Sequence, residues 1–236
     1  MRRETQNILL VLLGGALMKM AFTGTFLRYV KPSHKWLLIA AGAIMVGLAL
    51  VSIGRDLVRN ARQEGSHHHG TTSAWLLLLP VLAVFLVAPP ALGADSVQRS
   101  ATTNRSAATS DGSALFPPLQ AGDVIDMPLS DFASRAAWDT GNSLNDRSVR
   151  LTGFVVHDGK ATYVARLAIA CCAADAFPIK VKLDDSPDAT ALKDDTWIET
   201  VVTVKPGTAT RANDFVPSAT VSGIQKINQP EDPYEH

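Results

Sequence analysis

The chain has 236 residues, with 22 basic and 22 acidic side chains, so its formal net charge is zero. A chain of this length forms one or two domains, and a neutral chain has no overall electrostatic attraction to nucleic acid or to acidic lipid. Hydrophobic residues make up 47% of the sequence, but they are unevenly distributed. They form long runs before Pro90 and alternate with polar residues after Asp95. This contrast indicates a membrane half followed by a soluble half.

Residues 1–92 are expected to form a transmembrane region with three helical spans, at about residues 8–30, 36–53 and 75–92. A spanning helix needs roughly 17–25 mostly apolar residues, and each run is long enough. The third run ends in Ala91-Leu92-Gly93-Ala94, which is similar to a signal-peptidase site. Because two spans precede it, we interpret this run as a third span and not as a removable signal.

The basic residues in the short flanks of the spans predict the orientation of the chain. The flank before the first span and the loop between the second and third spans together contain Arg2, Arg3, Arg55, Arg59 and Arg62. The end of the first span and the loop that follows it contain Arg28, Lys31 and Lys35. The larger group marks the cytoplasmic side, so the N-terminus is expected in the cytoplasm. Three crossings then place the residues after Leu92 outside it, in a multi-pass protein of the cell membrane.

Lys19 lies near the middle of the first span. A charge there costs about 2.5–3.5 kcal/mol on insertion scales, and the apolar residues of the span can offset that cost. On a helix, Gly15, Lys19 and Thr23 share one face, which is expected to contact protein rather than lipid. Either Lys19 lines a pathway or pairs with a carboxylate of another subunit, or it binds backbone carbonyls and only orients the helices.

Two weaker patterns accompany the spans. Ala43 and Gly47 are four residues apart, a spacing of small residues that allows two helices to approach closely. His67, His68 and His69 lie in the loop between the second and third spans. A short histidine tract can bind Zn²⁺ or a similar ion. The alternative is a solvated polar loop without a ligand.

The second half is expected to contain a flexible linker and a β-rich domain. Residues 93–122 are rich in Ser, Thr and Ala, which is typical of a tether. In the extracytoplasmic domain, residues 123–236, alternating runs flank Asp158-Gly159 and predict a hairpin. The remaining expected elements are a short helix with Ser130 as its N-cap and strands at 123–127, 177–183, 196–204 and 216–227. This set indicates a small, OB-like barrel; because it lacks a basic aromatic face, nucleic acid is not an expected partner.

Cys171 and Cys172 are the two cysteines of the chain, and Asp175 follows them. By alternation, Cys171 continues the apolar face of Tyr163, Leu167 and Ile169, so it is expected to be buried, with Cys172 at a turn. Three interpretations remain open. The cysteines are structural, they bind a soft or borderline metal such as zinc together with Asp175 or His157, or they are redox-active.

The chain resembles the YcgQ-like family of bacterial membrane proteins, which are described as permease subunits. The matching stretches are Gly24-Thr25-Phe26-Leu27-Arg28-Tyr29-Val30-Lys31-Pro32, Trp75-Leu76-Leu77-Leu78-Leu79-Pro80, Ala88-Pro89-Pro90-Ala91-Leu92-Gly93 and Cys171-Cys172-Ala173-Ala174-Asp175-Ala176. The resemblance covers nearly the whole chain, and the Cys-Cys-x-x-Asp-Ala motif is its most specific part. It implies a two-component system in which a separate multi-span permease carries out transport.

The expected function is therefore an accessory subunit of a membrane permease for a metal ion or small solute, with the permease and the lipid bilayer as partners. The first alternative is a membrane-anchored, extracytoplasmic module that binds or senses a metal. The second is a thiol oxidoreductase. The sequence contains no nucleophile–base pair, phosphate loop or metalloprotease spacing, so an enzyme is not expected.

Overall fold

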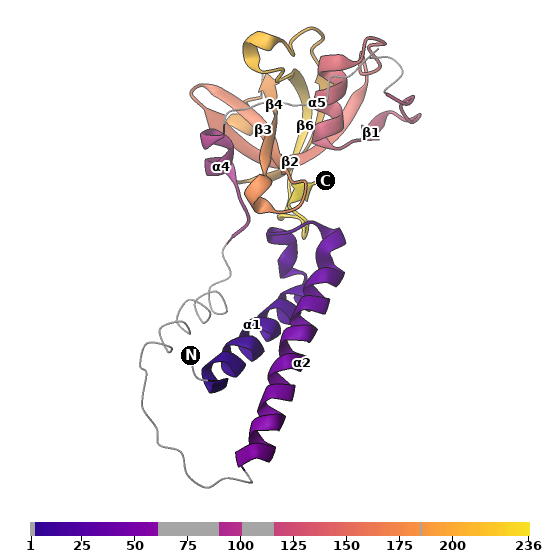
Figure 1. The fold of residues 1–236 in the computed structure, drawn as a ribbon. Coiled ribbons are helices and arrows are strands. Elements are labelled where there is room, and N and C mark those ends of the chain that lie inside the picture. The colour runs from indigo at the N-terminus through magenta and orange to yellow at the C-terminus, as the bar shows by residue number, and fades with distance from the viewer. Residues whose placement is uncertain (1–2, 61–89, 101–115, 185) are drawn as a thin grey trace. The chain divides into compact units, whose positions relative to one another are not determined.

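The computed structural model describes residues 3–60, 90–100, 116–184 and 186–236 (Figure 1). The chain divides into two compact units, Met1–Pro90 and Ala91–His236. The histidine tract His67–His69 lies outside the described residues, as does nearly all of the third span expected at 75–92.

The first unit contains two long helices, α1 (Arg3–Thr23) and α2 (Lys35–Asn60). Two short 3-10 helices, η1 (Thr25–Arg28) and η2 (Pro32–His34), connect them. Gly24 has a φ of 76°, a left-handed conformation that suits glycine and ends α1. By length and composition, Gln6–Thr23 and Pro32–Asp56 could each cross a membrane, with mean hydropathies of 1.4 and 2.5. Two of the three expected spans are therefore found as apolar helices.

Two glycines allow α1 and α2 to approach closely. A Cβ atom added to Gly14 would lie 2.8 Å from the carbonyl oxygen of Gly42, and one added to Gly42 would lie 2.8 Å from that of Gly14. Small residues at helix contacts are typical of membrane proteins, in which association depends on close packing. The pair Ala43 and Gly47 does not take part in this contact. Ala43 is exposed, and a Cβ added to Gly47 would meet no described atom within 4 Å.

The second unit contains a seven-stranded sheet in the order β1-β2-β5-β6-β4-β3-β7, with an additional pairing of β2 with β3. Its strands are β1 (Val124–Asp126), β2 (Ser148–Asp158), β3 (Ala161–Ala168), β4 (Phe177–Asp184), β5 (Trp197–Val204), β6 (Ser218–Lys226) and β7 (Tyr234–Glu235). Its helices are α4 (Ala94–Arg99), α5 (Leu129–Trp138), α6 (Pro187–Thr190), and the 3-10 helices η4 (Ala173–Asp175) and η5 (Arg211–Asn213). The predicted hairpin is confirmed: Gly159, with a φ of 60°, lies in the turn between β2 and β3.

Strand β2 has two antiparallel partners, β5 along Ser148–Phe154 and β3 along Phe154–Asp158. Strands β5 and β6 pair antiparallel, β6 and β4 pair parallel, and β4 and β3 pair antiparallel. The pairings of these five strands therefore form a circuit that returns to β2.

The apolar residues of this unit form two clusters on opposite faces of the strands. The larger cluster contains Leu151, Val155, Val164 and Ile198, and α5 packs on it through Phe132. The smaller cluster contains Phe154, Val156, Ala165, Leu167, Ile169, Trp197 and Tyr234. The expectation that Leu167 and Ile169 face the central core was wrong. They belong to the smaller cluster, because Val164 and Ala168 supply the β3 side chains of the larger one.

Helix α4 covers this smaller cluster, which corrects the expectation that residues 93–122 form only a flexible linker. Ala94 and Val97 are buried in the cluster. The carboxylate of Asp195 accepts a hydrogen bond from the backbone N–H of Ala94 at 2.6 Å, and Gln98 donates to Asp194 at 3.2 Å. The segment was assigned to a tether because two buried apolar residues in a polar stretch produce little periodic signal.

Helix α5 begins at Leu129, one residue before the expected N-cap Ser130. The backbone N–H groups of Leu129 and Ser130 donate to the two carboxylate oxygens of Glu235, at 2.7 and 2.9 Å. A carboxylate at a helix N-terminus satisfies N–H groups that have no partner within the helix and interacts favourably with the helix dipole. A residue more than 100 positions away therefore caps α5, and local sequence could not indicate it.

We predict that Gly14→Leu lowers the free energy of unfolding of the helix pair by about 1–3 kcal/mol, because the new side chain must displace the backbone of α2. The measurement is denaturant unfolding of the full chain in detergent micelles. Gly15→Leu is the matched control, because a Cβ at Gly15 meets no described atom within 4 Å. Equal stability of the two variants would contradict this helix contact.

We predict that Glu235→Ala destabilises the second unit by about 2–4 kcal/mol, because it leaves one buried and one half-buried N–H group without their charged acceptor. Thermal and denaturant unfolding of the full chain would measure the change. Glu231→Ala removes an exposed carboxylate and is expected to change stability by less than about 0.5 kcal/mol. A Glu235 variant as stable as the Glu231 variant would rule out the proposed cap.

Candidate functional site

The cysteine pair lies in a turn directly after β3. The ladder between β3 and β7 ends where the N–H of Ile169 donates to the carbonyl of Glu235 at 2.9 Å. The carboxylate of Asp175 then accepts hydrogen bonds from three successive backbone N–H groups, those of Ala170 (3.0 Å), Cys171 (2.9 Å) and Cys172 (3.4 Å). One carboxylate therefore holds the backbone of the turn.

The turn brings both sulfur atoms to the same side. The Sγ atoms of Cys171 and Cys172 are 3.6 Å apart, and one ligand atom from each of Cys171, Cys172 and Asp175 lies within 4.8 Å of the other two. Cys171 and Asp175 are exposed and Cys172 is half-buried. The prediction that Cys171 is a buried core residue was wrong, because the regular strand ends at Ala168 and alternation no longer applies.

The electrostatics of the site keep the Cys171 thiol protonated. Its pKa is raised to about 12, chiefly because the Asp175 carboxylate accepts a hydrogen bond from the thiol, with a further contribution from the hydrogen bond to Cys172. The same thiol hydrogen bond, followed by those from the backbone, lowers the pKa of Asp175. Reactive cysteines instead have a lowered pKa, so that much of the thiol is ionised at neutral pH. The turn therefore does not activate Cys171 as a nucleophile.

The alternative ligand His157 lies on β2 and is not one of the three residues whose ligand atoms cluster in this turn. Its Nδ1 is 2.6 Å from a carboxylate oxygen of Asp194, which also accepts the backbone N–H of His157 at 2.9 Å. Gln98 of α4 donates to the backbone carbonyl of His157 and to the same Asp194 carboxylate, so these hydrogen bonds connect α4 to β2.

Lys19 is exposed on α1, in the helical unit and not in the cysteine turn. The hydroxyl of Thr23 donates to the backbone carbonyl of Lys19 at 2.9 Å. Gly14 and Gly42, which make the close contact between α1 and α2, are both buried. Lys19 therefore lies away from this contact.

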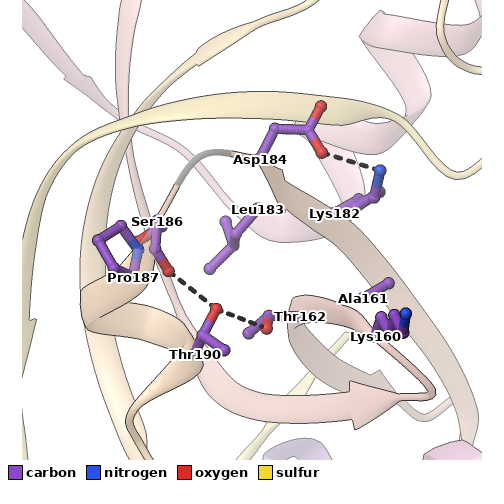
Figure 2. Close-up of a pocket in the computed structure, with 9 residues that line it drawn as sticks. All are labelled: Lys160, Ala161, Thr162, Lys182, Leu183, Asp184, Ser186, Pro187 and Thr190. Atoms are coloured by element: carbon purple, nitrogen blue, oxygen red, sulfur yellow. Dashed lines mark hydrogen bonds and ion pairs between the residues drawn. The ribbon is translucent and has the colours of Figure 1, made fainter.

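A second site that the sequence did not indicate is a polar cavity of about 370 Å³ beside β3, β4 and α6 (Figure 2). Its charged and hydroxyl groups largely bind one another. Lys182 and Lys205 both contact Asp184, at 2.9 and 3.0 Å, and the hydroxyls of Thr162 and Thr190 are 3.2 Å apart. Because its charges are paired internally, this cavity is a weaker candidate than the cysteine turn.

Comparison with known families gives two matches. Residues 5–103 match the DUF1980 N-terminal domain, and residues 136–236 match the DUF1980 C-terminal domain. The N-terminal match extends through α4, although α4 packs in the second structural unit. No curated protein and no solved structure matches the chain.

We predict that Asp175→Asn increases the rate at which iodoacetamide alkylates Cys171 at pH 8 by about tenfold or more. Removing the negative charge lowers the raised pKa of Cys171, so a larger fraction of the thiol is ionised at this pH. Peptide mass spectrometry on the Cys172→Ser background follows this single thiol. Asp188→Asn, on α6, is the control and should leave the rate unchanged. Equal rates in all forms would contradict the electrostatic role of Asp175.

Proposed function

Because the chain carries both the N-terminal and the C-terminal DUF1980 domains, we propose that it is a membrane-anchored module that binds a zinc-like divalent ion and serves as the accessory subunit of a multi-span permease. The observation that carries this proposal is the cluster of ligand atoms of Cys171, Cys172 and Asp175 in a single turn.

The dimensions of the turn support a single bound ion. Two sulfur atoms that each lie about 2.3 Å from a tetrahedral zinc are about 3.8 Å apart. The Sγ atoms of Cys171 and Cys172 are 3.6 Å apart, so both can bind one ion with little rearrangement. Thiolate ligands favour zinc and other soft or borderline ions over magnesium or calcium. The Asp175 carboxylate contributes a negative charge and an oxygen ligand.

The exposure and protonation of the turn favour reversible binding over a permanent structural ion. Cys171 and Asp175 are exposed, so an ion can reach them from solvent. Binding must displace a proton from Cys171, whose pKa is raised to about 12, which opposes binding. The turn is already held by Asp175 without an ion. These properties suit a domain that collects an ion and passes it on. A thiol oxidoreductase is less well supported, because the raised pKa of Cys171 opposes formation of the thiolate.

The membrane arrangement is part of the proposal. Helices α1 and α2 and the stretch at 75–92 would make three spans, and the excess of basic residues before and after the first two spans would place the second unit outside the cytoplasm. The circuit β2-β5-β6-β4-β3, closed by the pairing of β2 with β3, supports an OB-like barrel as the architecture of that unit.

The small size of the membrane region is the reason for proposing a permease partner. Three helices are too few to enclose a transport path by themselves, so transport would require a separate multi-span subunit or several copies of this chain. Lys19, on the exposed side of α1, would contact that subunit. The lipid bilayer is the other partner, and nucleic acid is not proposed. The three-histidine tract His67–His69 would act at most as a secondary ion site.

We predict that the full chain in detergent micelles, with His67, His68 and His69 replaced by alanine, binds one zinc ion, and that Cys171→Ser and Cys172→Ser each weaken binding by at least about tenfold. Isothermal titration after purification through a histidine-free tag measures the affinity. Removing the ion with a chelator should leave the fold unchanged, because Asp175 holds the turn by hydrogen bonds. Asp188→Asn is the control for loss of a carboxylate. Zinc that binds both cysteine variants with the original affinity would refute the site.

A further inference from the structure

A carboxylate–histidine pair lies at the end of the strand that borders the cysteine turn. Strand β7 pairs parallel with β3, with Leu167 opposite Tyr234 and Ala168 opposite Glu235. The ladder ends where the N–H of Ile169 donates to the carbonyl of Glu235. Figure 1 shows the yellow C-terminal strand at the orange end of β3, where the turn begins. His236 is therefore next to the segment that enters the turn.

The chain path brings His236 to the start of the turn. His236 directly follows Glu235, whose carbonyl accepts the N–H of Ile169, and Cys171 lies two residues after Ile169. The imidazole is not one of the three clustered ligands as it stands, so it must rotate toward them.

A carboxylate orients the imidazole. The Nε2 atom of His236 is 2.7 Å from one oxygen of Asp232, and the other oxygen of Asp232 accepts the backbone N–H of Tyr234 at 3.3 Å. Histidines that bind metals commonly donate the N–H of one ring nitrogen to a carboxylate, while the other nitrogen binds the ion. The hydrogen bond at Nε2 leaves Nδ1 as the nitrogen for an ion.

We propose that His236 is the fourth ligand of the ion held by Cys171, Cys172 and Asp175, and that Asp232 is its positioning residue. This inference rests on the proposed zinc-binding function. Two sulfurs, one oxygen and one imidazole nitrogen make a four-coordinate set that suits zinc. Three ligands belong to a turn fixed by hydrogen bonds, and the fourth comes from a separate strand end. Rotation of the His236 side chain would thus open or close the site during exchange of the ion.

The test uses the full chain in detergent micelles with His67, His68 and His69 replaced by alanine and with ¹⁵N-labelled histidine. We expect one equivalent of Zn²⁺ to shift the ring nitrogen signals of His236, which are assigned by their absence in His236→Ala. In a competition titration against a chelating dye, His236→Ala should bind zinc at least about tenfold more weakly. Asp232→Asn should weaken binding by about tenfold and alter the ring signals of His236.

His157→Gln is the matched control, because His157 is also paired with a carboxylate but lies away from the turn. It should leave the zinc affinity unchanged. If zinc binds through the cysteines while the His236 signals stay in place and His236→Ala keeps the full affinity, the fourth-ligand inference is overturned and the proposed function stands. If the chain binds no zinc, or binds it without either cysteine, the proposed function fails and this inference fails with it.

Discussion

The double pairing of β2 is the constraint on which the second unit depends. Because β2 bonds to β5 along its first seven residues and to β3 along its last five, the sheet must bend around Phe154, where the two ladders meet. The apolar side chains form a larger cluster on one face of the bent sheet, where α5 packs, and a smaller cluster on the opposite face. Gly153 is required at this point, because a Cβ there would lie 2.5 Å from the carbonyl oxygen of Ala165.

The smaller cluster determines where the candidate site lies. Its apolar side chains are covered by α4 and by Tyr234, and the strand that contains Tyr234 also supplies the Glu235 carboxylate that caps α5. Regular β3 structure ends at Ala168, which pairs with Phe177 at the start of β4, and the connecting segment turns around the carboxylate of Asp175. The cysteines are thus exposed at the edge of a well-packed region. A rigid support below exposed ligands favours a preformed site that an ion can enter and leave.

Much of the fold could be predicted from the sequence, because its signals are local. The Asp158-Gly159 turn between alternating runs identified the β2–β3 hairpin, and the long apolar runs identified α1 and α2. The errors came from interactions between distant residues. Alternation placed Cys171 in the core, but β3 ends three residues earlier, where its pairings with β4 and β7 also end. The composition of residues 93–99 suggested a tether, whereas Ala94 and Val97 fill a gap that only the folded sheet creates. The grouping of Cys171, Cys172 and Asp175 was predicted because all three lie within five residues. The pairing of β7 with β3, from which the role of His236 is inferred, joins distant parts of the chain and could not be predicted.

Joint binding of one ion by Cys171 and Cys172 underlies both the proposed function and the inferred role of His236. X-ray absorption spectroscopy at the zinc edge, on the full chain with His67, His68 and His69 replaced by alanine and loaded with one equivalent of zinc, tests it most directly. We expect two sulfur neighbours at about 2.3 Å and two nitrogen or oxygen neighbours at about 2.0–2.2 Å. A spectrum fitted by nitrogen and oxygen neighbours alone would contradict the claim, because it would place the ion away from both cysteines.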